Sequence, residues 1–196
     1  TGEWMELWNE LTQEEGKVAA YGEMTTGSAN DVLYIPLEFW FCRNPGLALP
    51  LIALQYHEVK FNVQFGAKGS AETSLYVDYI YLDTDERRRF AQISHEYLIE
   101  QVQFNGADSL KNGNGKVRLN FNHPCKELVW KCSTGGAVCP TGKVKLQLNG
   151  HDRFSTRDAK YFSHVQPYQH HSRVPDKDSK INVYSFGLKP AEHQPS

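Results

Sequence analysis

The chain has 196 residues, a formal net charge of −2, and 40% hydrophobic and 22% charged residues. This composition, with 15 Gly and 9 Pro, is typical of a turn-rich globular β protein rather than a helical or disordered one. The charge argues against a general nucleic-acid binder, which is normally strongly basic. The longest apolar stretch, residues 47–54, contains Pro50 and is far shorter than the roughly 18 residues that a membrane span requires.

The N-terminal part predicts a helix, a loop and an edge strand. Helical spacing of four apolar residues predicts a short amphipathic helix that covers one end of a sheet, and these residues are Trp4, Leu7, Trp8 and Leu11. A partner-binding helix with exposed tryptophans is the alternative. Residues 21–31 are rich in Gly, Ser, Thr and Asn and predict a loop. Residues 32–41 predict a strand at a sheet edge, because Pro36 cannot donate to a ladder.

The middle of the chain predicts strands on either side of a short charged helix. Residues 55–65 alternate in polarity, which predicts a strand with one buried face. Residues 75–82 are rich in tyrosine and branched aliphatic residues and predict another strand. Asp83 is expected to end that strand and cap a helix, with Glu86 completing a capping box. Residues 97–104 alternate again and predict the next strand.

The C-terminal half predicts a series of short strands. They are expected at residues 117–121, 126–132, 143–148 and 181–188. In the second of these, Leu128 and Trp130 are expected to face away from Val129. Asn149 and Gly150 form the best hairpin signal in the sequence. Many short strands without alternating long helices indicate an all-β sandwich or barrel.

The candidate catalytic and metal-binding residues have simpler structural explanations. Asp83 and Asp85 are the closest carboxylate pair, but helix capping explains them without catalysis. Four histidines are candidate metal ligands, but they lack the spacing that metal-binding motifs require: His57, His95, His170 and His171. The last two are adjacent, so they should point to opposite sides of an extended chain, and a solvated loop is expected there. We expect no catalytic residue, metal or cofactor.

The cysteines are too few and too scattered for a disulfide-stapled secreted scaffold. They are Cys42, Cys125, Cys132 and Cys139. The last three are separated by more residues than a zinc knuckle allows. Free thiols that pack as small hydrophobic groups, in a protein that folds in a reducing compartment, are therefore expected.

Arg87, Arg88 and Arg89 follow the capping box and carry three planar guanidinium groups within one helical turn. Such groups form bidentate ion pairs with carboxylates. The sequence leaves open whether they form a clamp within the chain or a contact between subunits.

Three long motifs resemble the major capsid protein of the nucleocytoplasmic large DNA viruses, of the type found in iridoviruses and large algal viruses. They occur in the expected order: IPLEFWFCRNPGLALPLIALQYHEV at 35–59, DERRRFAQISHEYLIEQVQ at 85–103 and LNFNHPCKELVW at 119–130. The resemblance extends from about Leu33 to the end of the chain.

The resemblance implies a double jelly roll, in which each roll consists of two packed antiparallel sheets. Because the family's protein is more than twice this length, the chain is expected to be an internal fragment. Residues 1–88 would be the C-terminal part of the first roll, and residues 89–196 the N-terminal part of the second.

The function that the resemblance implies is structural. The family's protein forms homotrimers that are pseudo-hexagonal capsomers of an icosahedral shell, assembled in the host cytoplasm. Its neighbours would be other capsomers, minor capsid proteins and an inner viral membrane beneath the shell that it does not span, with no direct nucleic-acid contact. A carbohydrate-binding or glycoside-hydrolysing jelly roll is the alternative. It would require exposed aromatics beside polar groups or paired carboxylates in a cleft.

Overall fold

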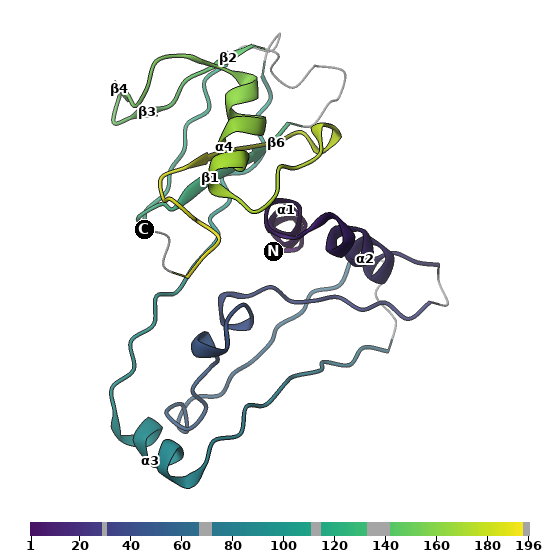
Figure 1. Cartoon of the computed structure of the whole chain (residues 1–196), viewed down its shortest axis with the longest axis vertical. Helices are drawn as coiled ribbons and strands as arrows, with labels where there is room; N and C mark the ends of the chain where they lie inside the picture. Colours follow the sequence, from purple (N-terminus) through teal and green to yellow (C-terminus); the bar gives the residue numbers. More distant parts are fainter. Residues whose placement is uncertain (29–30, 67–71, 111–114, 133–141, 194–196) are drawn as a thin grey trace. The chain divides into compact units, whose positions relative to one another are not determined.

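The computed structural model describes residues 1–28, 31–66, 72–110, 115–132 and 142–193. The chain divides into two units: the terminal unit, Thr1–Glu38 with Glu100–Ser196, and the central unit, Phe39–Ile99. The helices are α1 (Gly2–Thr12), α2 (Glu15–Thr25), α3 (Thr84–Gln92) and α4 (Gln166–His170) (Figure 1). The strands are β1 (Glu127–Lys131), β2 (Lys143–Val144), β3 (Gln147–Leu148), β4 (His151–Asp152), β5 (Arg157–Asp158) and β6 (Ile181–Ser185). Shorter turns are the 3-10 turns η1 (Trp40–Cys42), η2 (Pro45–Leu47) and η4 (Lys177–Ser179) and the π-helical turn η3 (Tyr161–Val165).

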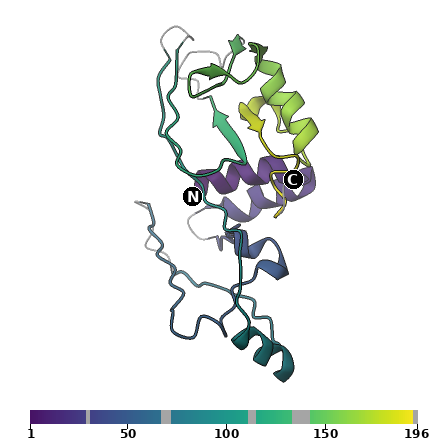
Figure 2. The same ribbon diagram turned by 90° about the vertical axis from the view of Figure 1, so that its left-hand side faces the viewer.

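The core of the terminal unit lies between α1 and the antiparallel pair β1–β6. Val129 of β1 stands opposite Val183 of β6. Leu11, Ile181 and Val183 form a buried cluster, against which Leu7 and Val129 pack. Figure 2 shows α1 and α2 side by side next to the two strands. The predicted amphipathic helix is therefore confirmed. It covers a sheet, and its Trp8 is only 9% exposed. The alternative of a partner-binding helix with exposed tryptophans is therefore not supported.

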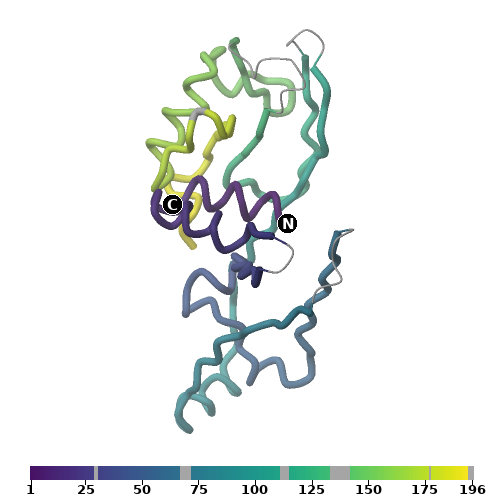
Figure 3. The backbone as a smooth tube through the Cα atoms, turned by 90° about the vertical axis from the view of Figure 1, so that its right-hand side faces the viewer, coloured from purple at the N-terminus to yellow at the C-terminus, as the bar shows by residue number. Residues whose placement is uncertain are grey.

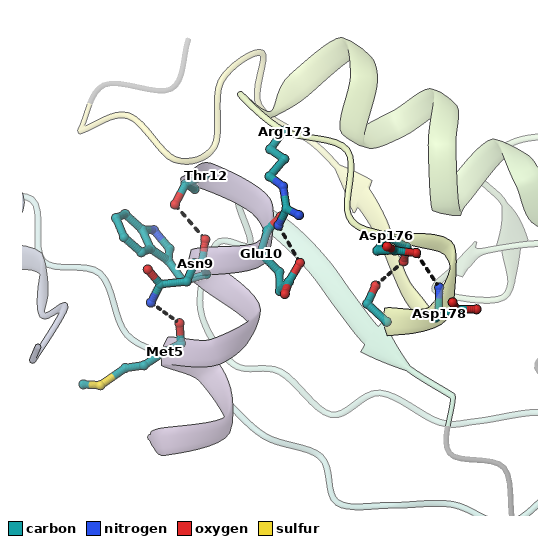
Figure 4. Close-up of polar contacts among 9 residues, drawn as sticks. Met5, Asn9, Glu10, Thr12, Arg173, Asp176 and Asp178 are labelled. Carbon is teal, nitrogen blue, oxygen red and sulfur yellow. Dashed lines mark hydrogen bonds and ion pairs between the residues drawn. The ribbon is translucent and has the colours of Figure 1, made fainter. Parts of the chain in front are cut away.

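A second set of contacts fastens α1 to the segment that precedes β6. The Arg173 guanidinium donates to a carboxylate oxygen of Glu10 at 2.6 Å, and the Arg173 backbone N–H donates to the carbonyl of Leu11 at 3.2 Å (Figure 4). The Asn9 side chain donates to the Met5 carbonyl one turn earlier in α1. These bonds satisfy polar groups at the end of α1 where it meets a segment distant in sequence.

The other face of β1–β6 packs against η3 and α4 through aromatic rings. Trp130 lies 5.4 Å from Phe162, and Tyr184 lies 5.0 Å from Phe154, measured between ring centroids. Phe162 is only 1% exposed. The prediction that Trp130 and Val129 occupy opposite faces of the strand is thus confirmed, and the sheet buries apolar side chains on both faces.

The predicted hairpin is present between β3 and β4. Asn149 and Gly150 have φ values of 52° and 86°, and Leu148 pairs with His151 across the turn. Two consecutive residues with positive φ are typical of the tight turns whose twist matches that of the strands. Hydrogen bonds from Gln147 and then Lys145 lower the pKa of the Asp152 carboxyl, which is fully exposed.

Several predicted strands are extended segments without a backbone ladder in the described part of the chain. These are residues 32–39, 58–65, 75–82, 97–104 and 117–121, whereas residues 40–41 belong to η1 and residues 55–57 to a turn. A strand requires a hydrogen-bonded neighbour, and polarity alternation alone does not supply one. The loop expected from residue 21 is also wrong at its start, because α2 continues to Thr25.

Two of these segments nevertheless lie beside each other. The Asn105 amide donates to the Arg118 carbonyl at 3.0 Å, and the Asn122 backbone N–H donates to the Gln103 side chain at 3.2 Å. The contacts run antiparallel, as expected if residues 97–104 and 117–121 are neighbouring strands joined by a long turn. Side chains rather than a backbone ladder make these contacts.

The central unit is held together mainly by ring contacts. Phe39 stacks on Phe41 at 5.3 Å, and Trp40 lies 5.9 Å from Tyr97. Among the described residues of this unit, only Leu47 is a buried hydrophobic residue. Within the unit, α3 joins two long extended segments (Figure 3). The predicted division at residues 88 and 89 concerns the two jelly rolls rather than contacts within this chain, and it stays a prediction.

Candidate functional site

The carboxylates at the start of α3 are engaged in capping. Asp83 accepts a hydrogen bond from the Glu86 backbone N–H at 2.8 Å, and the Glu86 side chain accepts one from the Asp83 N–H at 3.4 Å. Asp85 lies 3.6 Å from the Arg88 guanidinium. The predicted capping box is therefore confirmed. These contacts account for Asp83 and Asp85 without an acid–base role.

Replacing Asp83 by alanine is expected to weaken α3 by about 1 kcal/mol, the usual effect of losing an N-cap side chain. The Glu86 amide would then exchange its hydrogen about fivefold faster, since 1.4 kcal/mol corresponds to a factor of ten. Hydrogen exchange measured by NMR checks this. Asp83→Asn is the matched control, because asparagine also accepts the capping bond. Equal exchange rates in the two variants would contradict the capping role.

The adjacent histidines have different partners, but the predicted extended, solvated loop is wrong for both, because His170 ends the helix α4 and the His171 side chain is buried. His170 Nδ1 lies 2.9 Å from the Leu188 carbonyl. The side chain of His171 is 1% exposed, and its Nε2 lies 2.9 Å from Oε2 of Glu127, whose side chain is 13% exposed. Neither atom completes a well-directed hydrogen bond within the described residues, and the two side chains carry opposite charges only when the imidazole is protonated. This pair joins the end of α4 to β1.

His57 and His95, the other two candidate metal ligands, contact no carboxylate in the described part of the chain. His57 is exposed at the end of a turn. His95 is half-buried, and its Nε2 lies 2.7 Å from the carbonyl of Phe90. In the described ranges, no group of three or more His, Cys, Asp or Glu side chains is arranged to hold a metal ion.

The cysteines differ from the expected free thiols in one case. Cys42 and Cys125 are not disulfide-bonded, and both are exposed rather than packed as small hydrophobic groups, whereas Cys132 is disulfide-bonded. The expectation of a free thiol is therefore wrong for Cys132, because the distance between two cysteines in space, not their spacing in the sequence, decides whether a disulfide forms. Partial burial raises the pKa of the Cys125 thiol, which disfavours the thiolate that metal binding and nucleophilic attack require. Cys139 lies outside the described residues.

Trp40 and Trp130 are used in internal packing and are not the exposed aromatics that a carbohydrate-binding surface would require. The Trp40 ring contacts Phe41 and Tyr97, and the Trp130 ring contacts Phe162. A shallow cavity of about 260 Å³ lies between α1, α2 and the segment around Pro36, and Lys17, Tyr21 and Glu38 are among its lining residues. Its walls offer no pair of carboxylates across a cleft.

The arginines of α3 have few partners inside the chain. Among the described residues, Arg88 pairs with Asp85 within the helix, and neither Arg87 nor Arg89 has a carboxylate partner. All three are exposed. The interpretation as a clamp within the chain is therefore not supported by any contact of the described residues.

Large apolar side chains are exposed along the extended segments, which the sequence analysis expected to bury on one face. Tyr76 and Tyr81 have exposures of 89% and 91%, and Phe104 is 78% exposed. Composition and periodicity identified these residues as strand-forming, but the shortage of internal partners became visible only in the structure. Contiguous exposed apolar surface of this kind typically marks an interaction site. No helix in the described part of the chain is both long and apolar enough to cross a bilayer.

A solved structure resembles the chain over almost its whole length. A quasi-atomic model of the PBCV-1 virus capsid covers 99% of this chain, and this chain covers 62% of the solved one. The TM-score is 0.75 and the sequence identity 36%. The fold is therefore that of a viral capsid protein, and the carbohydrate-binding alternative gains no support.

Sequence comparisons define the family. The family model described as large eukaryotic DNA virus major capsid protein matches residues 86–196, and that described as major capsid protein N-terminus matches residues 1–71. The major capsid protein of Pyramimonas orientalis virus is 51% identical over 99% of the chain and 60% of its own length. That of Paramecium bursaria Chlorella virus 1 is 37% identical over 99% of the chain and 59% of its own length. The chain belongs to the major capsid proteins of the large eukaryotic DNA viruses, and it spans about 60% of the length of these two relatives.

Proposed function

We propose that the chain is a structural component of an icosahedral virus shell, in which homotrimers form pseudo-hexagonal capsomers. The observation that carries this proposal is the structural match to the PBCV-1 capsid over 99% of the chain at a TM-score of 0.75. The protein would act by self-association rather than catalysis. The engagement of Asp83 in the cap of α3, and of Asp85 with Arg88 in the same helix, supports a non-enzymatic role.

The division of the chain between two jelly rolls is part of this proposal. Residues 1–88 would close the first roll and residues 89–196 would open the second. The two family models support the division, because one ends at residue 71 and the other begins at residue 86. The helix α3 lies across this boundary.

The exposed surface of the chain supports a role in assembly. Tyr76, Tyr81 and Phe104 are 89%, 91% and 78% exposed. Such surface is stable in water when further polypeptide or partner subunits cover it.

The partners proposed for the complete protein follow from this role. They are two further copies in the trimer, neighbouring capsomers and minor capsid proteins, with an inner viral membrane beneath the shell. The net charge of −2 favours protein neighbours over the genome. Assembly would take place in the host cytoplasm and the product would be the virion capsid.

A chimera tests the proposed function. The chain would replace the aligned region of the Pyramimonas orientalis virus major capsid protein, to which it is 51% identical. We expect the chimera to form oligomers of the same mass as the parent protein, measured by light scattering, with a threefold outline in electron micrographs. A folded chimera that stays monomeric while the parent protein assembles would contradict the proposal.

A further inference from the structure

The exposed helix α3 presents a surface that the rest of its unit does not use. We propose that the arginine face of α3, formed by Arg87, Arg88 and Arg89, docks on a glutamate-rich face of helices α1 and α2 in a second copy of this chain. This inference rests on the proposed function, because it names one of the contacts through which copies of the chain associate.

The first argument is that α3 lacks packing partners of its own. It has nine residues and none of them is buried. Isolated helices shorter than about 12–15 residues are marginal in water, and most helical stability in proteins comes from packing. The capping box of Asp83 and Glu86 fixes where the helix begins but provides no packed face. Phe90 is half-buried beside His95, at 5.2 Å between ring centroids, and leaves the arginines free to face outward.

The second argument is that the charges of α3 suit a protein surface better than a membrane. Three acids, Asp83, Asp85 and Glu86, precede the three arginines, so the formal charges of this stretch cancel. An anionic bilayer would repel the acidic end while it attracted the basic end. A protein surface can match both, and guanidinium groups form bidentate pairs with carboxylates.

The third argument identifies the complementary surface. Residues 2–25, which include α1 and α2, contain six glutamates and one lysine. Five of these glutamates are exposed and define the glutamate face: Glu3, Glu6, Glu14, Glu15 and Glu23. The sixth, Glu10, is already paired with Arg173 (Figure 4). Burial, and then the charges of Glu6 and Glu38, raise the pKa of Tyr21 on α2, so the negative field of α1 reaches α2.

The proposed contact is heterologous, because the arginine face of one copy meets the glutamate face of the next. Repeated head-to-tail contacts of this kind close into rings when the rotation between copies allows it. Such a contact suits a protein that assembles with itself. It should weaken as salt is raised, because exposed charges are screened.

Charge reversal in the full chain tests the contact. One variant is R87E/R88E/R89E, the second is E3R/E6R/E23R, and the control K116E/R153E/K160E reverses three exposed cations elsewhere. Association is measured by titrating unlabelled chain into fluorescently labelled chain at low salt. Each of the first two variants should lower self-association about tenfold, as expected for the loss of several exposed ion pairs. An equimolar mixture of these two should associate nearly as well as the unaltered chain, and the control variant should also.

The outcomes separate the alternatives. If the two reversals restore association only when combined in one chain and not in the mixture, the contact lies within a chain and the inference fails. If R87E/R88E/R89E loses binding to phosphatidylserine vesicles while self-association stays unchanged, a membrane is the partner and the inference fails. R87Q/R88Q/R89Q, which removes charge without adding acids beside the cap, should weaken association in the same direction. If association is insensitive to every reversal while the chimera still assembles, the shell function stands and this contact does not.

Discussion

Replacing Leu11 by alanine is expected to lower the free energy of unfolding of the terminal unit by about 2–5 kcal/mol. Leu11 is 1% exposed and packs in the cluster with Ile181 and Val183. Its truncation removes apolar surface from the core and leaves a cavity between α1 and β6. Because both α1 and the sheet depend on this contact, we expect the loss to reach β6. Hydrogen exchange of the β6 amides measures the change.

The same substitution at an exposed leucine provides the control. Leu188 is 68% exposed, so Leu188→Ala should change the free energy of unfolding by no more than about 0.5 kcal/mol. Equal losses in the two variants would show that α1 does not seal the core of the terminal unit. A loss at Leu11 alone would establish that the N-terminal helix is an integral part of a core whose strands lie more than a hundred residues later.

Replacing His171 by leucine is expected to cost about 1–3 kcal/mol, the usual penalty when a buried polar group loses its partner. The substitution removes the imidazole that lies 2.9 Å from Glu127, and it leaves that carboxylate 13% exposed without a partner. A buried charge without a partner is costly because it loses hydration and gains nothing in return. Chemical denaturation followed by the fluorescence of Trp130, which lies on the same strand as Glu127, measures the effect.

A double variant distinguishes loss of charge pairing from loss of packing. E127M/H171L removes both members of the pair and keeps similar side-chain volumes, so it should recover most of the stability that His171→Leu loses. If the double variant is as unstable as the single one, the imidazole contributes through its shape rather than through Glu127. The pair matters because it joins the end of α4 to β1, and β1 forms the sheet on which α1 also packs.

The features that the sequence predicted correctly are those set by neighbours along the chain. The spacing of Leu7 and Leu11 placed α1, and the capping box of Asp83 and Glu86 placed the start of α3. Asn149 and Gly150 defined a hairpin because their positive φ values suit a tight turn. Each of these depends on hydrogen bonds or backbone angles within a few residues, so the local sequence contains the necessary information. The family resemblance was also carried by continuous motifs.

The features that only the tertiary structure decided depend on residues far apart in sequence. The pairing of Glu127 with Ser185 and the docking of Arg173 on Glu10 join segments that no local pattern connects. His171 lies in a polar stretch that reads as a solvated loop, yet contacts from distant elements bury it. The extended segments also show that local composition is not sufficient. Residues 75–82 have the composition of a strand, but a ladder forms only when another strand lies beside them. Strand formation and burial are properties of pairs of segments, and for this reason the sequence alone determined where strands could form while the tertiary structure decided which of them did.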